Sequence, residues 1–132
     1  SIYWPFRMLR DAATGDALRI ALRAPEMNTT RRGDVPVIDV AATFDEPTGN
    51  GSVSIVNRDA DKPVDVHLRI ADRAMTVTTA TVLHAHPKAQ NDWDSPRTVA
   101  PTNLPVTTHD DGTLPFRLPA PAHAVLQLTT LA

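Results

Sequence analysis

The stretch VIDVAATFDEPTGNGSVSIVN, residues 37–57, decides the fold. Its first half alternates apolar and smaller or polar side chains, which is the pattern of a half-buried β-strand. The segment Glu46–Gly51 contains Pro, two Gly and the dipeptide Asn50-Gly51, a strong signal for a tight hairpin turn. Residues 52–57 then return as a second strand. The sequence therefore predicts an antiparallel β-hairpin at this point.

Working outward, four further segments carry strand patterns: residues 17–22, 64–70, 75–83 and 114–118, with a last one at 124–131. The clearest alternation is that of Val64, Val66, Leu68 and Ile70. Residues 24–36 and 84–105 show no period and are predicted to be loops. Only residues 5–14 are expected to form a helix, because Pro5 suits a first helical turn and Gly15 follows the last periodic residue.

Six or seven short strands joined by turns favour an all-β fold, an antiparallel β-sandwich of jelly-roll type preceded by one short helix. The inward-facing side chains of the predicted strands should form its core. We expect the following residues to be largely buried: Leu18, Ile20, Ile38, Val40, Phe44, Val53, Ile55, Val66, Leu68, Val125 and Leu128.

Composition excludes several classes of function. The 132 residues match one domain, and a formal net charge of -2 with 5% aromatic side chains provides little attraction for a nucleic acid. No apolar run approaches the roughly 20 residues of a membrane span. The chain has no cysteine, which excludes disulfides, a thiolate nucleophile and cysteine-ligated metals but leaves cytosol and periplasm equally open.

Acidic residues are the first candidates for chemistry, since glycoside hydrolysis uses two carboxyl groups flanking the scissile bond. The only glutamates are Glu26, predicted in a loop, and Glu46, beside Asp45 in the hairpin turn. Water at both places would leave the carboxylates unperturbed. Asp39 lies on a strand face, where a solvated or arginine-paired side chain is the simpler interpretation. A catalytic pair is not expected.

Histidines and tryptophans are the remaining candidates. His84 and His86 are two residues apart and would share a strand face, as metal ligands can; Asp92, Asp94 or His109 could supply a third ligand. The alternative is that both histidines anchor a loop through hydrogen bonds. No Gly-x-Ser-x-Gly elbow and no phosphate-binding glycine loop occur. Trp4 and Trp93 could stack on a sugar ring, with Trp93 in the long loop the better candidate.

Several motifs, in this order, resemble the C-terminal region of glycoside hydrolase family 51 α-L-arabinofuranosidases. They are Ser1-Ile-Tyr-Trp-Pro-Phe6, Ala17-Leu18-Arg19, Ala24-Pro25, Asp34-Val-Pro-Val-Ile-Asp39, Ala42-Thr-Phe-Asp-Glu46, Ser54-Ile-Val-Asn-Arg58, Val82-Leu83-His84, Ala89-Gln-Asn91-Asp-Trp-Asp-Ser-Pro96, Leu118-Pro and Val125-Leu-Gln-Leu128. The resemblance covers nearly the whole chain. It departs at residues 85–88 and at Ala122-His123-Ala124, where the family usually has Ser-Trp-Asn.

The resemblance implies that residues 1–16 are the end of a catalytic (β/α)8 barrel and residues 17–132 a C-terminal β-sandwich. The catalytic glutamates would then lie upstream of Ser1, so no residue of this chain is assigned a catalytic, cofactor-binding or metal role, and no cofactor is implied. The implied partners are the upstream barrel, an arabinose-containing polysaccharide bound through that barrel, and further copies of the full enzyme in a homo-oligomer. The apolar start, with Ile2, Tyr3, Trp4 and Phe6, agrees with this interpretation, because a partner would cover it. The alternative is a short N-terminal strand packed in the core of the chain itself.

Two hypotheses follow. In the first, the chain is the non-catalytic C-terminal portion of a retaining arabinofuranosidase and is inactive alone. In the second, it is a stand-alone carbohydrate-binding or structural β-sandwich, whose affinity for sugar would depend on Trp93.

Overall fold

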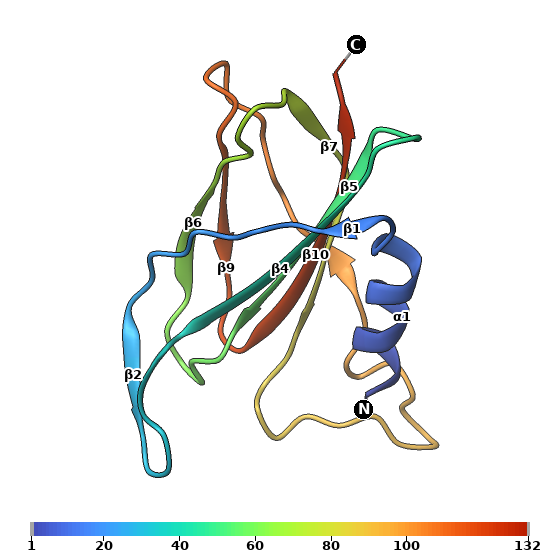
Figure 1. Ribbon diagram of the computed structural model, residues 1–132. Helices are drawn as coiled ribbons and strands as arrows, with labels where there is room; N and C mark the ends of the chain where they lie inside the picture. Colours follow the sequence, from blue (N-terminus) through green and yellow to red (C-terminus); the bar gives the residue numbers. More distant parts are fainter. Residues whose placement is uncertain (1, 132) are drawn as a thin grey trace.

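The computed structural model describes residues 2–131; Ser1, the first residue of the opening motif, and Ala132 lie outside the described residues. Helix α1 (Tyr3–Ala12) is followed by antiparallel strands arranged in three sheets. The largest sheet has the order β1-β4-β5-β10-β7-β8, and the pairs β2-β3 and β6-β9 form the other two (Figure 1). The strands are β1 (Asp16–Ala17), β2 (Glu26–Thr29), β3 (Gly33–Pro36), β4 (Ile38–Asp45), β5 (Asn50–Asn57), β6 (Val64–Leu68), β7 (Met75–His84), β8 (Thr102–Asn103), β9 (Leu114–Leu118) and β10 (Ala122–Thr130).

The predicted antiparallel β fold is confirmed, and so is the hairpin that decides it. Strands β4 and β5 pair from Ile38 opposite Asn57 to Asp45 opposite Asn50. The turn lies slightly earlier than the Asn50-Gly51 signal suggests, because both of these residues already pair in β5. Gly49 instead adopts the left-handed conformation, with φ of 71°. A glycine meets that requirement without steric cost.

The main core lies between the six-stranded sheet and the β6–β9 pair. Strand β10 runs between β5 and β7, and its inward side chains Ala124 and Leu126 are fully buried. Strand β9 supplies Leu114 and Leu118 from the opposite side, also fully buried. Of the residues expected in the core, Ile38, Phe44, Val53, Ile55 and Leu128 are buried in this cluster, and Val40, Val66 and Leu68 are partly buried against it.

The prediction of burial was wrong for two residues, since Leu18 is 44% exposed and Ile20 is 37% exposed. Strand β1 ends at Ala17, and after a last bond from Leu18 N–H to the Ala42 carbonyl the chain leaves the sheet. Figure 1 shows this segment crossing away from β4 toward β2. The alternation of residues 18–22 has no partner strand, and without one a period-2 pattern buries nothing.

Residues 24–36 were predicted to be a loop, but they contain the β2–β3 hairpin. Met27 packs against the main core, but most of the hairpin is exposed and makes polar contacts. The Thr29 hydroxyl donates to the Gly33 carbonyl at 2.8 Å, the Asn28 amide donates to the Asp34 carboxylate at 2.9 Å, and Arg32 N–H donates to the Thr29 oxygen at 3.1 Å. Side-chain hydrogen bonds therefore replace the apolar alternation from which strands are predicted.

Helix α1 covers the outer face of the large sheet, two residues earlier than the predicted 5–14. Its Met8 and Ala12 are buried together with Val125, and Leu9 and Leu83 pack against them. Val125 is therefore buried as expected, but under the helix instead of in the main core. Adjacent residues of β10 point to opposite faces of the sheet, so β10 contributes to both clusters.

The Asn57 side chain, only 1% exposed, joins three segments at one end of the sandwich. Its amide nitrogen donates to the Lys62 carbonyl at 3.0 Å and to the Pro119 carbonyl at 3.2 Å, and its oxygen accepts from Asp59 N–H at 3.1 Å. It thereby holds the end of β5, the 58–63 turn and the β9–β10 connection together.

We expect Asn57→Ala to lower the free energy of unfolding by about 2–4 kcal/mol, because it leaves buried backbone groups without partners. Urea unfolding of both proteins measures the difference. Asn103→Ala, at an exposed position, is the matched control and should change stability by less than about 0.5 kcal/mol. Equal effects of the two substitutions would contradict the role assigned to Asn57.

Candidate functional site

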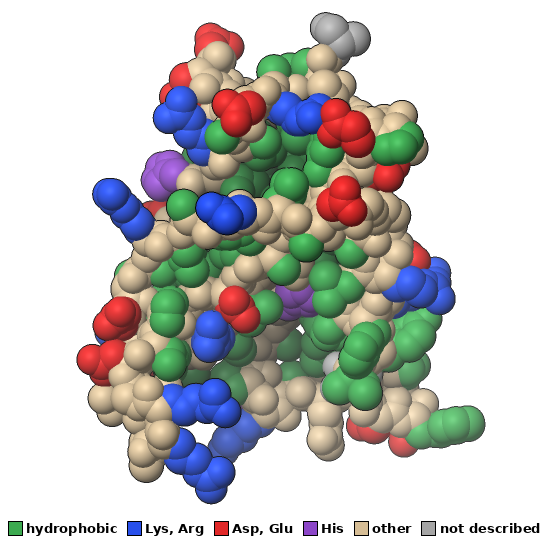
Figure 2. All heavy atoms as spheres, viewed as in Figure 1, with side chains coloured by type: hydrophobic (Ala, Val, Ile, Leu, Met, Phe, Trp, Pro, Cys, Tyr) green, Lys and Arg blue, Asp and Glu red, His purple; other side chains and the backbone are tan. Residues whose placement is uncertain are grey.

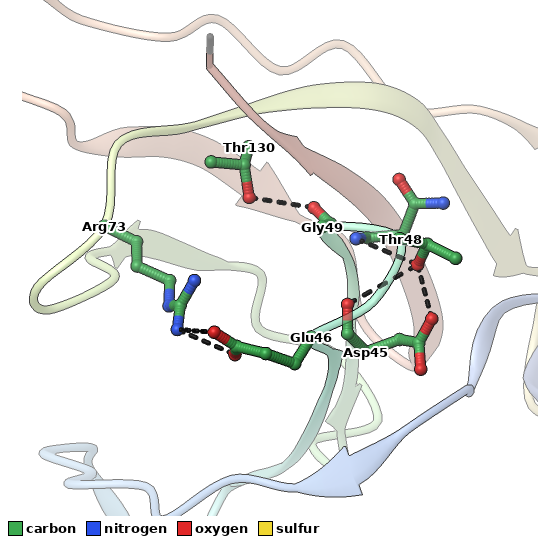
Figure 3. Close-up of polar contacts among 7 residues, drawn as sticks. Asp45, Glu46, Thr48, Gly49, Arg73 and Thr130 are labelled. Carbon is green, nitrogen blue, oxygen red and sulfur yellow. Dashed lines mark hydrogen bonds and ion pairs between the residues drawn. The ribbon is translucent and has the colours of Figure 1, made fainter.

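Glu46 lies at the β4–β5 turn, where polar contacts join the hairpin to neighbouring segments. One guanidinium nitrogen of Arg73 donates to both Glu46 carboxylate oxygens, at 2.8 and 2.7 Å, and the same guanidinium lies 4.3 Å from the centroid of the Phe44 ring. Figure 3 shows the neighbouring bonds: Thr130 donates to the Gly49 carbonyl at 2.9 Å, and Thr48 donates to Asp45. These contacts tie the hairpin to its neighbours and leave Glu46 paired with a cation at the surface.

The structure does not bring the two glutamates together. Glu26 is exposed in β2, opposite Pro36, whereas Glu46 lies at the far tip of the β4–β5 hairpin (Figure 1). Asp39 is 71% exposed and lies 3.7 Å from the Arg58 guanidinium, an ion pair of the surface type expected from the sequence. Glu46, with 69% of its side chain exposed, and Glu26 are likewise open to solvent.

The two histidines predicted as possible ligands do not share a strand face, because β7 ends at His84 and His86 follows it. His84 Nδ1 donates to the Pro121 carbonyl at 2.8 Å, and His86 Nδ1 accepts from Lys88 N–H at 3.2 Å. Within residues 2–131 no group of three or more His, Asp or Glu side chains is arranged to hold a metal ion. Both hydrogen bonds fit the alternative in which these histidines anchor the loop.

His123 stands where the family usually has the tryptophan of its Ser-Trp-Asn stretch, and it forms a polar site within the sheet. It lies on β10, and its Nε2 is 2.9 Å from the Ser54 hydroxyl of β5. Its buried Nδ1 has no hydrogen-bond partner among the described residues. Burial lowers the pKa of His123 below the ordinary value. Its only signal in the sequence is a histidine inside an apolar strand, which does not reveal the partner across the sheet.

An open depression of about 610 Å³ lies between the start of α1 and the loop that follows β7. Tyr3, Trp4 and Arg7 line it from the helix, and Asn91, Asp92, Pro96 and Arg97 line it from the loop. The Arg97 guanidinium lies 5.2 Å from the Trp4 ring centroid, and the Tyr3 and Trp4 rings meet edge to face at 5.0 Å. Trp4 was predicted as a possible sugar-stacking residue, but nothing in the sequence indicates that it lies beside this loop.

Hydrophobic side chains are also exposed around this region. Figure 2 shows them gathered over α1 on one face of the molecule. Trp93, in the same loop, is 96% exposed; Ile2, which caps the start of the helix, is 76% exposed, and Phe6 on the helix is 69% exposed. In the described part of the chain, no helix is both long and apolar enough to span a membrane.

The fold defines a small antiparallel β domain with one helix packed on the outer face of its large sheet. A family model described as the α-L-arabinofuranosidase C-terminal domain matches residues 1–122. The chain belongs to that family.

Its relatives include an intracellular exo-α-(1→5)-L-arabinofuranosidase of Bifidobacterium longum, to which it is 30% identical over 126 residues. That match covers 89% of this chain and 22% of the relative. A solved family 51 α-L-arabinofuranosidase of the same organism superposes with a TM-score of 0.88 at 29% identity, over 95% of this chain and 25% of the other. The family 51 enzyme of Xanthomonas axonopodis pv. citri shares the fold, with a TM-score of 0.68 at 20% identity over 80% of this chain and 21% of that one. The chain thus spans about a quarter of the length of these relatives or less.

The lowered pKa of His123 predicts a pH-dependent stability. The unfolded chain takes up the proton near the ordinary histidine pKa of about 6.5, and the folded chain does so only at lower pH. The contribution of His123 is therefore complete above that value and is lost as the pH falls toward the folded pKa. Urea unfolding at about pH 7 and about pH 5 should show a smaller loss on acidification for His123→Gln than for the unsubstituted chain.

His67→Gln, at an exposed histidine of β6, is the control and should leave the difference between the two pH values unchanged. If His123→Gln loses as much stability on acidification as the unsubstituted chain, the effect does not come from this histidine. Asp59 and Asp111, whose pKa values are lowered by hydrogen bonds from backbone N–H groups, act at more acidic pH and are present in all three proteins.

Proposed function

We propose that this chain is the non-catalytic C-terminal portion of a retaining α-L-arabinofuranosidase that releases arabinose from arabinoxylan or arabinan. The observation that carries the proposal is the family match over residues 1–122, which includes the helix and all the strands as far as the start of β10. In a retaining mechanism, one carboxylate forms a covalent glycosyl-enzyme and a second acts as acid and then base, roughly 5–5.5 Å away. Glu26 and Glu46 belong to separate hairpins, so both carboxylates are assigned to a preceding part of the polypeptide.

The division into two parts belongs to the same proposal. Residues 1–16 are assigned to the end of a catalytic (β/α)8 barrel and residues 17–132 to the sandwich. The exposed face of α1 supports this assignment: one side of the helix is buried on the sheet through Met8 and Ala12, whereas Ile2 and Phe6 present apolar surface outward. A helix with apolar side chains on opposite faces is suited to lie between two bodies. The barrel is the body that would cover the outer face.

The alternative is a stand-alone carbohydrate-binding module, which the exposure of Trp93 favours. The two hypotheses differ in the size of the polypeptide that carries these residues. Antibody detection on a denaturing gel of the source cells should show a band several times larger than the 14.3 kDa of this chain. A band at that mass alone would support the stand-alone module.

We expect the isolated chain of residues 1–132 to show no hydrolysis of an aryl α-L-arabinofuranoside, because its two glutamates lie in separate hairpins with Glu46 paired to Arg73. A fluorescent or chromogenic leaving group makes the assay sensitive to trace activity. Turnover that survives repurification and is abolished by Glu46→Gln would overturn the assignment of catalysis to another part of the polypeptide.

The outer face of α1 gives a second test. Phe6→Asp should change the stability of the isolated chain by less than about 0.5 kcal/mol, since the side chain is 69% exposed. In the full-length polypeptide the same substitution should place a charge in the interface with the barrel and lower the thermal midpoint by several degrees. Leu131→Asp, at an exposed apolar residue that directly follows β10, is the control. The end of β10 lies away from the start of α1 (Figure 1). Equal behaviour of the two variants in the full-length polypeptide would count against the division at residue 16.

A further inference from the structure

The loop between β7 and β8 holds Trp93 away from the protein. The side chain is 96% exposed, more than any other large hydrophobic residue among residues 2–131. An indole that could bury itself against the domain would gain hydrophobic free energy by doing so. Its exposure therefore has to be explained by the loop that carries it.

Hydrogen bonds close this loop on both sides of Trp93. The Asn91 amide donates to the Val99 carbonyl at 2.8 Å and accepts from Val99 N–H at 2.6 Å. Within that closure, the Asp92 carboxylate accepts from Ser95 N–H at 2.7 Å. Such bonds from an Asp or Asn side chain to nearby backbone stabilise a turn without a core beneath it. Trp93 is thus presented by a pre-organised turn.

The depression described above adjoins the same turn, since Asn91, Asp92 and Arg97 line it. It combines the Trp4 ring with amide, carboxylate and guanidinium groups. Apolar rings together with a few convergent polar groups are typical of small-molecule sites. Sugars match this chemistry, because their C–H faces pack on an aromatic ring and their hydroxyls both donate and accept hydrogen bonds.

Charge narrows the class of ligand. Residues 85–101 carry two cationic side chains, Lys88 and Arg97, and two carboxylates, Asp92 and Asp94. Arg7, which also lines the depression, lies 3.6 Å from the Asp11 carboxylate. The charges around the site therefore balance, and a neutral ligand fits it better than a phosphate backbone or another polyanion.

We propose that Trp93, with the adjoining depression, is a binding subsite for a neutral pentose-containing oligosaccharide. One sugar ring stacks on the Trp93 indole, and Asp92 and Arg97 provide hydrogen-bond partners for the hydroxyls of a neighbouring unit. The choice of pentose sugars rests on the proposed function. The existence of a sugar site rests on the loop itself.

Two measurements on residues 1–132 test the subsite. Native gels containing soluble arabinoxylan or debranched arabinan should retard the chain, and titration with xylo- or arabino-oligosaccharides should shift the tryptophan emission. We expect Trp93→Ala to weaken binding at least tenfold and Trp93→Phe to weaken it less, because the smaller ring still stacks. Leu131→Ala, which removes an exposed apolar side chain elsewhere, should bind as the unsubstituted chain does. The thermal midpoint should be the same in all variants.

The outcomes separate this inference from the proposed function. No retardation by any polysaccharide, or retardation that Trp93→Ala leaves unchanged, overturns the subsite and does not affect the gel and hydrolysis tests of the arabinofuranosidase. Trp93-dependent binding to β-glucan but not to either pentosan overturns the choice of sugar. A change from dimer to monomer on Trp93→Ala without sugar binding would identify the surface as a contact between copies of the chain, which also overturns the subsite.

Discussion

The fold depends on the buried amide of Asn57, where the chain makes its changes of direction between sheets. Strand β5 ends there, the 58–63 turn leads to β6 of the opposite sheet, and the β9–β10 connection passes the same point. A buried amide can serve all three because it has both donors and an acceptor. The carbonyls of Lys62 and Pro119 would otherwise be left without partners, which is costly in the interior. An apolar residue of the same size could fill the space but could not set the relative positions of the three segments.

The regular part of the fold was predictable, because the alternation of apolar and polar residues in each of its strands shows which side chains are buried. In β4, β5, β6 and β9 one face meets the core, so the alternation of residues such as Ile38 and Phe44 is visible in the sequence. Leu18 and Ile20 show the limit of this reasoning, since the alternation was present and the partner strand was not. The β2–β3 hairpin shows the opposite limit. Its strands pair through bonds such as that between Asn28 and Asp34, which leave no period in the hydrophobic pattern.

Sites were harder to predict than strands, because their chemistry depends on contacts between distant residues. The position of Glu46 in a turn was enough to disfavour catalysis, but the Arg73 that neutralises it comes from 27 residues further along. Ser54 and His123 are separated by 69 positions and meet only because β5 and β10 are neighbours. Trp4 and Arg97 likewise belong to the helix and to the loop after β7. Sequence spacing predicts local geometry, whereas each of these contacts depends on the tertiary arrangement of strands, turns and helix.

The two faces of β10 belong to two separate hydrophobic clusters, which differ in how many side chains they contain. One face completes the main core with Ala124, Leu126 and Leu128, and that core needs no further partner. The other face presents Val125 to the small cluster under α1, where only Met8 and Ala12 of the helix are buried. A helix held by so few side chains is stabilised weakly by this domain alone, since most helical stability in proteins comes from tertiary packing. If the proposed barrel packs on the outward apolar side chains of α1, it would add to this stabilisation from the opposite side of the helix. The contact between Arg97 and Trp4 joins the helix to the loop that carries Trp93, so a change in the position of the helix would be passed to that loop.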